Sequence, residues 1–180
     1  GLVLVSGFYS LDPVVLSSGV YRRNVDLEQV SESTVVRHRD GKTASISLVL
    51  APDSVLSIRT NGKPSSSMAL GAAGPPTGDE TVSVLLGALP SLLKPDARTA
   101  LNVGMGSGLT THSLLGSPSL ESVTTVELEP AMVRLAEGFA PRNDRAFEDP
   151  RSRIVVRDAR SFLSSSRERF DLVVTQPFNP

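Results

Sequence analysis

The fold of this chain is decided by the stretch TALNVGMGSGL, residues 99–109. It begins as a short apolar run of β-forming residues and then reaches three glycines spaced two apart, Gly104, Gly106 and Gly108, before a helix-like segment. Glycines let the backbone turn tightly against a ligand, and a helix N-terminus offers free N–H groups with a partial positive charge. The stretch therefore predicts either an anion or nucleoside site, or a turn that only packs a strand against a helix.

An acidic residue farther along the chain favours the nucleoside interpretation. Apolar residues resume at Val123 and end at Glu127, roughly 20 residues beyond the glycines, which is where nucleoside-binding βαβ units hold the ribose hydroxyls. An ionised carboxylate suits this task because it accepts two hydrogen bonds. The alternative is that Glu127 merely ends the strand and Glu129 caps the next helix ahead of Pro130. Leu109 stands where a dinucleotide fingerprint has its third Gly or Ala, which disfavours NAD and favours an S-adenosyl type of cofactor.

Composition places the chain among ordinary globular proteins. The 180 residues suffice for one domain or for one domain with a small appendage, and 39% hydrophobic with 21% charged residues is typical of a soluble protein. The formal net charge of −1 provides no field to attract nucleic acid. No run of residues approaches the length of a transmembrane helix.

The side-chain inventory excludes several chemistries. Cysteine is absent, so disulfides and thiolate metal sites are excluded, and the two histidines are too few for a histidine-rich metal centre. We expect no metal and a cytoplasmic location. The chain opens on Gly1 and closes on Pro180 just after a strand-like run, and we interpret it as part of a longer protein.

The first part of the chain predicts a small antiparallel β-meander. Asp40-Gly41 between two alternating runs indicates a two-residue hairpin, and Asn61-Gly62 ends the last run. Residues 63–78 are rich in Ser, Gly and Pro, so we expect a loop that is either a domain boundary or a lid near a site. The strands expected in this part are residues 34–36, 45–50 and 55–58.

The second part predicts an α/β domain with a parallel sheet. A helix over residues 79–93, bent or ended at Pro90, leads into alternating strands and helices. We expect Leu172-Val173-Val174 to be a strand buried on both faces. If the strand order is 3-2-1-4, this last strand is left as an open apolar edge, and further strands are then expected beyond it. The expected division is an N-terminal segment with the meander over 1–64, a linker over 65–78, and a Rossmann-like domain over 79–180. The expected strands are 99–103, 122–127, 154–157 and 170–175, and the helices between them are 109–115, 131–139 and 160–165.

Two further positions stand where ligands bind in open α/β sheets, at the carboxyl ends of strands. Asp158 either accepts a hydrogen bond from an adenine amine or caps the helix that follows it. Gln176, in the proline-rich turn after the last strand, offers an amide to a substrate, although a plain loop is an equal alternative. We expect His112 to be a packing or surface residue.

Taken together, these motifs resemble the spermidine synthase family of aminopropyltransferases, most of all the bacterial spermidine-synthase-like domains often fused behind a membrane-spanning region. The likeness covers nearly the whole chain, and the motifs taken together in this order are far more specific than any one of them. The residues that carry it are 16–22, 39–44, 59–63, 85–90, 103–109, 126–130, 149–151, 158–160 and 171–180.

The resemblance implies a methyltransferase-like Rossmann sheet, here truncated after its fourth strand, behind the β-meander. It implies decarboxylated S-adenosylmethionine as aminopropyl donor and a diamine such as putrescine as acceptor, and it is compatible with a homodimer. By position, the three glycines would line the nucleoside, Glu127 would hold the ribose, and Asp158 with Ala159 would contact the adenine.

The chain departs from the family at residues that carry the chemistry. Family enzymes have an Asp after the fourth strand that deprotonates the attacking amine, and this catalytic position is Gln176 here, with Asn179 at a second Asp position. Ser107 replaces the acidic residue of the glycine loop, and Ala88 replaces a histidine. Three functions therefore stay open: an aminopropyltransferase with altered acceptor chemistry, an S-adenosylmethionine-dependent methyltransferase, and a catalytically silent nucleoside-binding domain.

Overall fold

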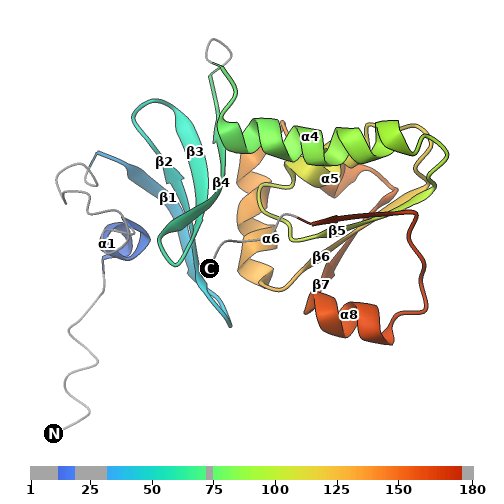
Figure 1. Cartoon of the computed structure of the whole chain (residues 1–180). Helices are drawn as coiled ribbons and strands as arrows, with labels where there is room; N and C mark the ends of the chain where they lie inside the picture. The colour runs from blue at the N-terminus through green and yellow to red at the C-terminus, as the bar shows by residue number, and fades with distance from the viewer. Residues whose placement is uncertain (1–11, 19–31, 72–74, 176–180) are drawn as a thin grey trace, which may run out of the picture.

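The chain folds around two four-stranded sheets, one antiparallel and one parallel (Figure 1). The computed structural model describes residues 12–18, 32–71 and 75–175. The antiparallel sheet has the order β1-β2-β3-β4, and the parallel sheet has the order β7-β6-β5-β8. In chain order the parallel sheet is 3-2-1-4, the order that leaves the fourth strand at an edge. A short helix, α1 (Pro13–Ser18), lies beside β1.

The antiparallel sheet is the predicted meander with one additional strand. Its strands are β1 (Thr34–Asp40), β2 (Ser45–Leu50), β3 (Val55–Thr60) and β4 (Lys63–Ala69). Strand β4 lies inside the stretch expected to be a loop, so that expectation is wrong for residues 63–69. Asn61 and Gly62 have φ of 48° and 75°, the left-handed values of a two-residue hairpin turn, and they pair Lys63 with Thr60. Pairing with β3 thus makes a strand of a serine-rich segment whose own sequence has little β character.

The first hairpin forms where it was predicted, but its connection is longer than two residues. Asp40 pairs with Ser45, and the turn spans residues 41–44, with the Gly41 N–H donating to the Ala44 carbonyl. The N–H and the hydroxyl of Thr43, in this turn, both donate to the carboxylate of Glu129, which follows β6 (Ser122–Glu127).

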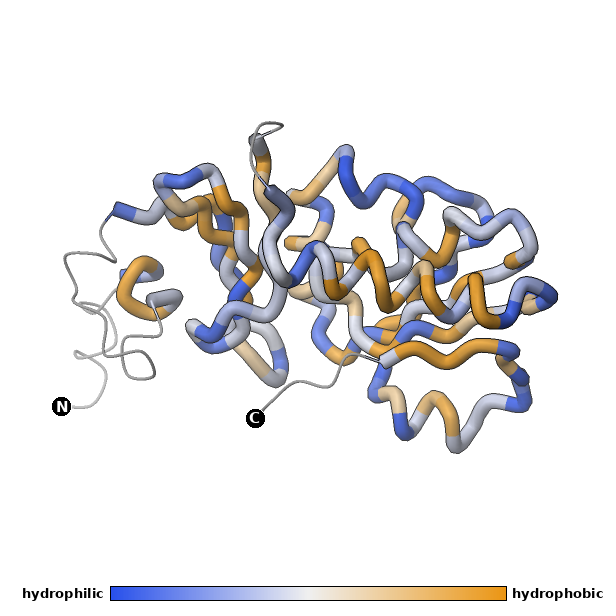
Figure 2. Tube along the Cα trace, turned by 45° about the horizontal axis from the view of Figure 1, so that its top comes forward, coloured by the Kyte–Doolittle hydropathy of each residue, from blue (hydrophilic) through white to orange (hydrophobic). Residues whose placement is uncertain are grey.

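The parallel sheet matches the predicted strands closely. Strands β5 (Thr99–Val103) and β6 (Ser122–Glu127) have the predicted bounds, whereas β7 (Ser152–Val156) begins two residues early and β8 (Leu172–Thr175) two residues late. The prediction that residues 172–174 are buried on both faces is wrong, because Val173 is 60% exposed. Strand β8 is the edge strand, and no described helix covers its second face. Figure 2 shows hydrophobic colour along β8 at this edge.

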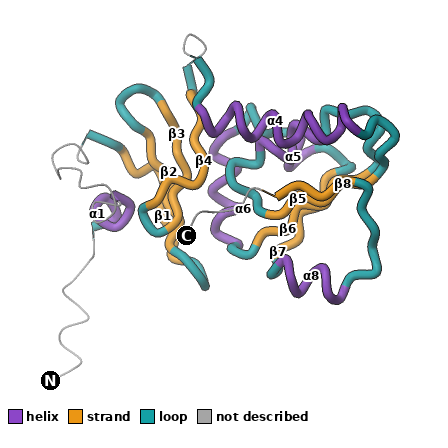
Figure 3. Tube along the Cα trace, viewed as in Figure 1, coloured by secondary structure: helices purple, strands orange, loops and turns teal. Residues whose placement is uncertain are grey.

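Helices cover the two faces of the parallel sheet (Figure 1). On one face lie α4 (Gly78–Leu93) and α5 (Leu109–Leu114), and on the other lies α8 (Ala159–Ser165). Thr77 and Glu80 form a capping box that starts α4, and the helix continues past Pro90 to Leu93. Helix α6 (Pro130–Ala136) stands between the two sheets, as Figure 3 shows, followed by the turn η1 (Glu137–Phe139) and by α7 (Arg145–Glu148).

One hydrophobic cluster joins the antiparallel sheet to the helical segment that follows β6, and Ile154 of β7 packs against it. Ile46, Leu48 and Ile58 of the antiparallel sheet pack in it together with Met132 and Phe139 of the α6–η1 segment, and all five side chains are buried. The expected linker therefore does not separate two independent cores. The interface between the sheets is fixed by close packing, and a cavity at that interface has a defined shape.

Candidate functional site

A cavity of about 420 Å³ lies between the two sheets, at the carboxyl ends of the parallel strands. Val103 with Gly104, Glu127 with Glu129, and Asp158 with Ala159 line it from the ends of β5, β6 and β7. Thr43, Ala44, Ile46 and Thr60 form the wall on the antiparallel side. Ligands of open α/β sheets bind at this edge, and the volume is in the range of small-molecule sites. This cavity is the candidate functional site.

Glu127 presents a fixed carboxylate to this cavity. The side chain is 9% exposed, its Oε2 accepts the Met105 N–H at 2.8 Å, and its Oε1 accepts the Glu129 N–H at 2.8 Å. These two bonds orient the carboxylate and connect it to the glycine loop. Each oxygen keeps a further lone pair, so the group can still accept hydrogen bonds from the hydroxyls of a sugar.

The three glycines serve different purposes. All have positive φ: 94° at Gly104, 52° at Gly106 and 80° at Gly108. Only Gly104 lines the cavity, and a Cβ added to it would meet no atom within 4 Å. A Cβ at Gly108 would lie 3.0 Å from Met105 Cε and 3.3 Å from Asn143 Nδ2. Gly108 is therefore required for the turn that starts α5. That the three glycines line a nucleoside stays a prediction, and Gly104 is the one of them that lines this cavity.

Gly106 borders a second, smaller pocket of about 30 Å³ between β4, α4 and the glycine loop. This pocket adjoins the larger cavity, because Val103 and Gly104 line both. The side chains around it are uncharged, and among the described residues that line it there is no carboxylate. Its hydroxyl-bearing residues are Ser65, Ser66, Ser83, Ser107 and Thr110.

Asp158 caps helix α8, and it also lines the cavity with Ala159. Its Oδ1 accepts the Ser161 N–H at 2.8 Å, and that hydrogen bond lowers the pKa of the Asp158 carboxyl below its usual value. The capping alternative is thus observed. A contact between this carboxylate and an adenine amine stays a prediction.

Sequence reasoning missed the side chains that support the glycine loop. Asn143 is fully buried, and its amide donates to the Ser107 and Ala136 carbonyls, each at 2.7 Å. The amide of Asn102 likewise donates to the Gly104 carbonyl at 3.0 Å. Asn143 lies in a polar, arginine-rich stretch, residues 141–153, whose composition gives no local signal for a buried side chain.

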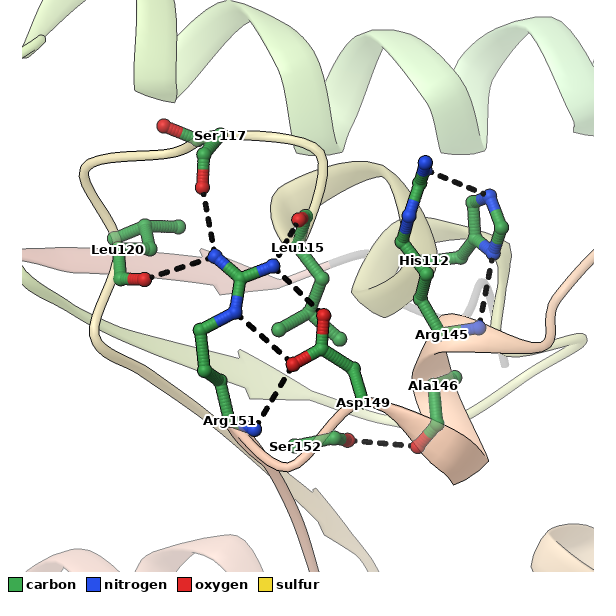
Figure 4. Close-up of polar contacts among 9 residues, drawn as sticks. All are labelled: His112, Leu115, Ser117, Leu120, Arg145, Ala146, Asp149, Arg151 and Ser152. Carbon is green, nitrogen blue, oxygen red and sulfur yellow. Dashed lines mark hydrogen bonds and ion pairs between the residues drawn. The ribbon is translucent and has the colours of Figure 1, made fainter.

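Arg151 and Asp149 secure the opposite edge of the parallel sheet (Figure 4). The guanidinium of Arg151 donates to the carbonyls of Leu115, Ser117 and Leu120 and pairs with Asp149 at 2.7 Å. These bonds fix the loop between α5 and β6. In this way the motif Asp149-Pro150-Arg151 serves the scaffold, far from the cavity edge of the strands.

His112 also belongs to this scaffold, in agreement with the expectation for it. Its Nδ1 accepts the backbone N–H of Arg145 at 3.3 Å, and its Nε2 faces the Arg145 guanidinium at 3.2 Å (Figure 4). Partial burial and the neighbouring Arg145 charge lower the pKa of the His112 imidazole.

The expected catalytic position, Gln176, lies outside the described residues, as does Asn179. Thr175, the last described residue, lines the cavity at the end of β8. Across the described residues, no group of three or more His, Asp or Glu side chains could hold a metal ion. In the same part of the chain, no helix has both the length and the apolar character needed to cross a membrane.

Residues 80–180, more than half of the chain, match the model of the spermine/spermidine synthase domain. The chain belongs to the spermine/spermidine synthase family. It is 38% identical over 96 residues to the polyamine aminopropyltransferase of Nitrosomonas europaea, covering 51% of this chain and 30% of that protein. It is 36% identical over 88 residues to polyamine aminopropyltransferase 1 of Streptomyces coelicolor, covering 47% of this chain and 16% of that protein.

Solved members of the family share the fold. The spermidine synthase of Thermotoga maritima superposes with a TM-score of 0.67 at 19% identity, covering 78% of this chain and 47% of that one. A spermidine synthase in complex with the transition state analogue AdoDATO superposes with a TM-score of 0.69 at 19% identity, covering 81% and 47%. The chain thus spans less than half the length of the relatives it matches here.

Proposed function

We propose that this domain binds decarboxylated S-adenosylmethionine in the cavity between the sheets and transfers its aminopropyl group to a small amine such as putrescine. Membership of the spermine/spermidine synthase family supports the reaction, and a similar fold in a spermidine synthase complexed with AdoDATO supports an adenosyl ligand. The observation that carries the proposal is the buried carboxylate of Glu127, fixed at the end of β6 with free acceptor capacity at the cavity.

The residues of the cavity fit an adenosyl donor. Glu127 would accept the ribose hydroxyls, and the open space above Gly104 would let the donor approach the backbone. Ile46 and Met132 offer apolar contacts to a base, with Asp158 and Ala159 at the same wall. The donor supplies a carbon that is activated by its positively charged sulfur. In the transfer the amine nitrogen bonds to that carbon while the carbon–sulfur bond breaks, and the electron pair of that bond goes to sulfur.

The attacking amine must also lose a proton. An amide does not accept one at neutral pH, so at the catalytic position Gln176 would orient the acceptor, and the proton would pass to solvent water. We place the activity in the cytoplasm, in keeping with a chain without cysteine. A membrane-spanning region elsewhere in the parent chain and a homodimer stay predictions.

Isothermal titration calorimetry with decarboxylated S-adenosylmethionine tests the assignment of Glu127. We expect Glu127→Ala to weaken binding about tenfold or more, because a charge-assisted pair to ribose is lost. Glu121→Ala is the matched control: Glu121 immediately precedes the same strand at its other end, is exposed, and should leave the affinity unchanged. An unchanged affinity in Glu127→Ala rules out this assignment.

The choice of donor separates the three functions. Tighter binding of the decarboxylated donor supports aminopropyl transfer, whereas tighter binding of S-adenosylmethionine itself supports methylation. Binding without turnover of any amine supports a silent domain.

Acceptor chemistry is tested in the full-length protein with Gln176→Asp. If only the base is missing, this substitution increases aminopropyl transfer to putrescine, measured by product formation. No gain would mean that the acceptor pocket itself differs from that of the family enzymes.

A further inference from the structure

A continuous line of hydrogen bonds crosses the wall of the cavity from the glycine loop to the antiparallel sheet. The Met105 N–H donates to Glu127, and the Glu129 N–H donates to the other oxygen of the same carboxylate. The carboxylate of Glu129 in turn accepts the N–H and the hydroxyl of Thr43, each at 3.0 Å. Three segments that are distant in sequence are thereby joined at one cavity.

Of these contacts, those between Glu129 and Thr43 connect the half of the molecule that contains the parallel sheet to the half that contains the antiparallel sheet. The Glu129 side chain is 4% exposed, and besides Thr43 it accepts the Ala131 N–H at 3.2 Å, at the start of α6. Burial alone would raise the pKa of this carboxyl, but the hydrogen bonds from Thr43 and Ala131 hold the pKa below its usual value. Glu129 is therefore an ionised group at neutral pH, and charge-assisted hydrogen bonds are the stronger kind.

The turn that Glu129 binds has no space for a side chain at its first residue. A Cβ added to Gly41 would overlap the carboxyl group of Glu129. The backbone of the turn therefore lies directly against the carboxylate, and Thr43 and Ala44, which follow it, line the cavity. The contact falls within the β1–β2 connection, residues 41–44.

We propose that Glu129 is a positioning residue for the adenosyl site: its carboxylate holds the turn 41–44 as one wall of the cavity, and its backbone N–H holds the Glu127 carboxylate that faces the sugar. The inference rests on the proposed function, since it assigns a purpose to a residue of the same cavity. Glu129 acts through Thr43 and Glu127, and it needs no contact of its own with the ligand.

Glu80 provides a matched control, because it is a buried carboxylate that joins the same two halves away from this cavity. It is 2% exposed, accepts the Ala69 and Thr77 N–H groups at 2.9 Å each, and pairs with Arg142 at 2.6 Å. If Glu129 served only to hold the halves together, Glu80→Gln and Glu129→Gln would have the same consequences.

The test measures the dissociation constant for decarboxylated S-adenosylmethionine by calorimetry and the melting temperature of each variant. We expect Glu129→Gln to weaken binding about tenfold, because an amide has one acceptor oxygen where the carboxylate has two and cannot accept from Thr43 and from Ala131 at the same time. Gly41→Ala should also weaken binding, because the added methyl group forces the Glu129 carboxylate away from the turn. Glu80→Gln should lower the melting temperature and leave the affinity of the folded protein unchanged.

Two substitutions of Thr43 test whether its hydroxyl is needed for binding. Thr43→Ser keeps both the N–H and the hydroxyl and should bind as the wild type does, whereas the isosteric Thr43→Val loses the hydroxyl and should weaken binding about threefold. These two variants and Gly41→Ala keep the proposal testable even if Glu129→Gln fails to fold.

Two results would overturn the inference: wild-type affinity in Glu129→Gln and Gly41→Ala, or an equal loss of affinity in Glu80→Gln. Its failure is distinguishable from failure of the proposed function. If Glu127→Ala weakens binding while the Glu129, Gly41 and Thr43 variants do not, only the positioning inference is wrong. If the wild-type protein binds no adenosyl donor, the proposed function is wrong and the inference falls with it.

Discussion

The two edges of the parallel sheet use charged residues in opposite ways. At the carboxyl edge, the Glu127 carboxylate is held by two backbone N–H groups and still faces a cavity. At the amino edge, Arg151 donates to three loop carbonyls and pairs with Asp149, so its donors are used within the protein. Both edges are polar, but only one keeps hydrogen-bonding capacity for a ligand.

Asp171 illustrates the amino edge further. Its Oδ2 accepts the N–H groups of Arg98 and Thr99, at 2.8 and 2.9 Å, and the Thr99 hydroxyl at 3.1 Å. These bonds provide acceptors for the backbone N–H groups at the start of β5. The comparison teaches that charge alone does not identify a binding residue in this fold: what distinguishes Glu127 is its place at the carboxyl end of a strand, beside open space.

The loss of the Arg151 hydrogen bonds at the amino edge should have the largest effect on stability. We expect Arg151→Met to lower the free energy of unfolding by about 3 kcal/mol, because three carbonyls and the Asp149 carboxylate lose their donor. Urea unfolding measures this loss, and the affinity of the folded protein for the adenosyl donor should not change. Arg98→Met is the control, because its pair with Glu121 is exposed and should contribute less than about 1 kcal/mol. Equal losses in the two variants would contradict the distinction between the edges.

Within the glycine loop, Gly104 and Gly108 should differ in whether their substitution affects binding or stability. Both Gly108→Ala and Gly104→Ala place a side chain at positive φ, which costs of order 1–3 kcal/mol of stability, and Gly108→Ala adds contacts with Met105 and Asn143. We therefore expect Gly108→Ala to be the less stable variant in urea unfolding. Gly104→Ala should be the weaker binder in calorimetry, because its methyl group projects toward the cavity that the donor would fill. The reverse order for affinity would mean that Gly104 does not face the ligand.

The smallest effect concerns pH. Hydrogen bonds from the Arg151 side chain and backbone lower the pKa of the Asp149 carboxyl from 3.8 to about 2. Because the folded-state pKa lies below the unfolded value, the stabilisation is fully present above pH 3.8 and is lost as the pH falls toward about 2. The free energy of unfolding, measured across this pH range, should fall more steeply with decreasing pH in the wild type than in Arg151→Met. Parallel curves for the two proteins would contradict this origin of the acid sensitivity.

The strands at the cavity edge could be predicted from the sequence because their signals are local. The bounds of β5 and β6 follow from apolar runs that end at Gly104 and at Glu127. The handedness of parallel crossovers restricts the possible topologies, and the observed order 3-2-1-4 is one that it allows. Glu127 could be placed at the cavity for the same reason, since the ends of parallel strands meet at one edge.

The misses have different origins. Strand β4 is a local one: it pairs with β3 across the two-residue turn Asn61-Gly62, although its serine-rich sequence favours a loop. Val173 was expected to be buried because its run is apolar, yet it lies on an edge strand with no described helix over that face. Asn143 contacts Ser107, 36 residues earlier, and no local pattern predicts that contact.

The sequence alone determined that a strand, a glycine turn and a helix would be followed by an acidic strand end, because each of these is a short-range pattern of residue types. Local pattern also indicated that Glu129 and Asp158 cap helices, as both do, whereas the long-range partners of the acidic residues depend on the tertiary structure. Glu127 faces the cavity, Glu129 holds a turn 86 residues away, and Asp149 neutralises Arg151. The physical reason is that a carboxylate takes its function from the donors that surround it, and packing brings those donors from segments that are distant in the chain.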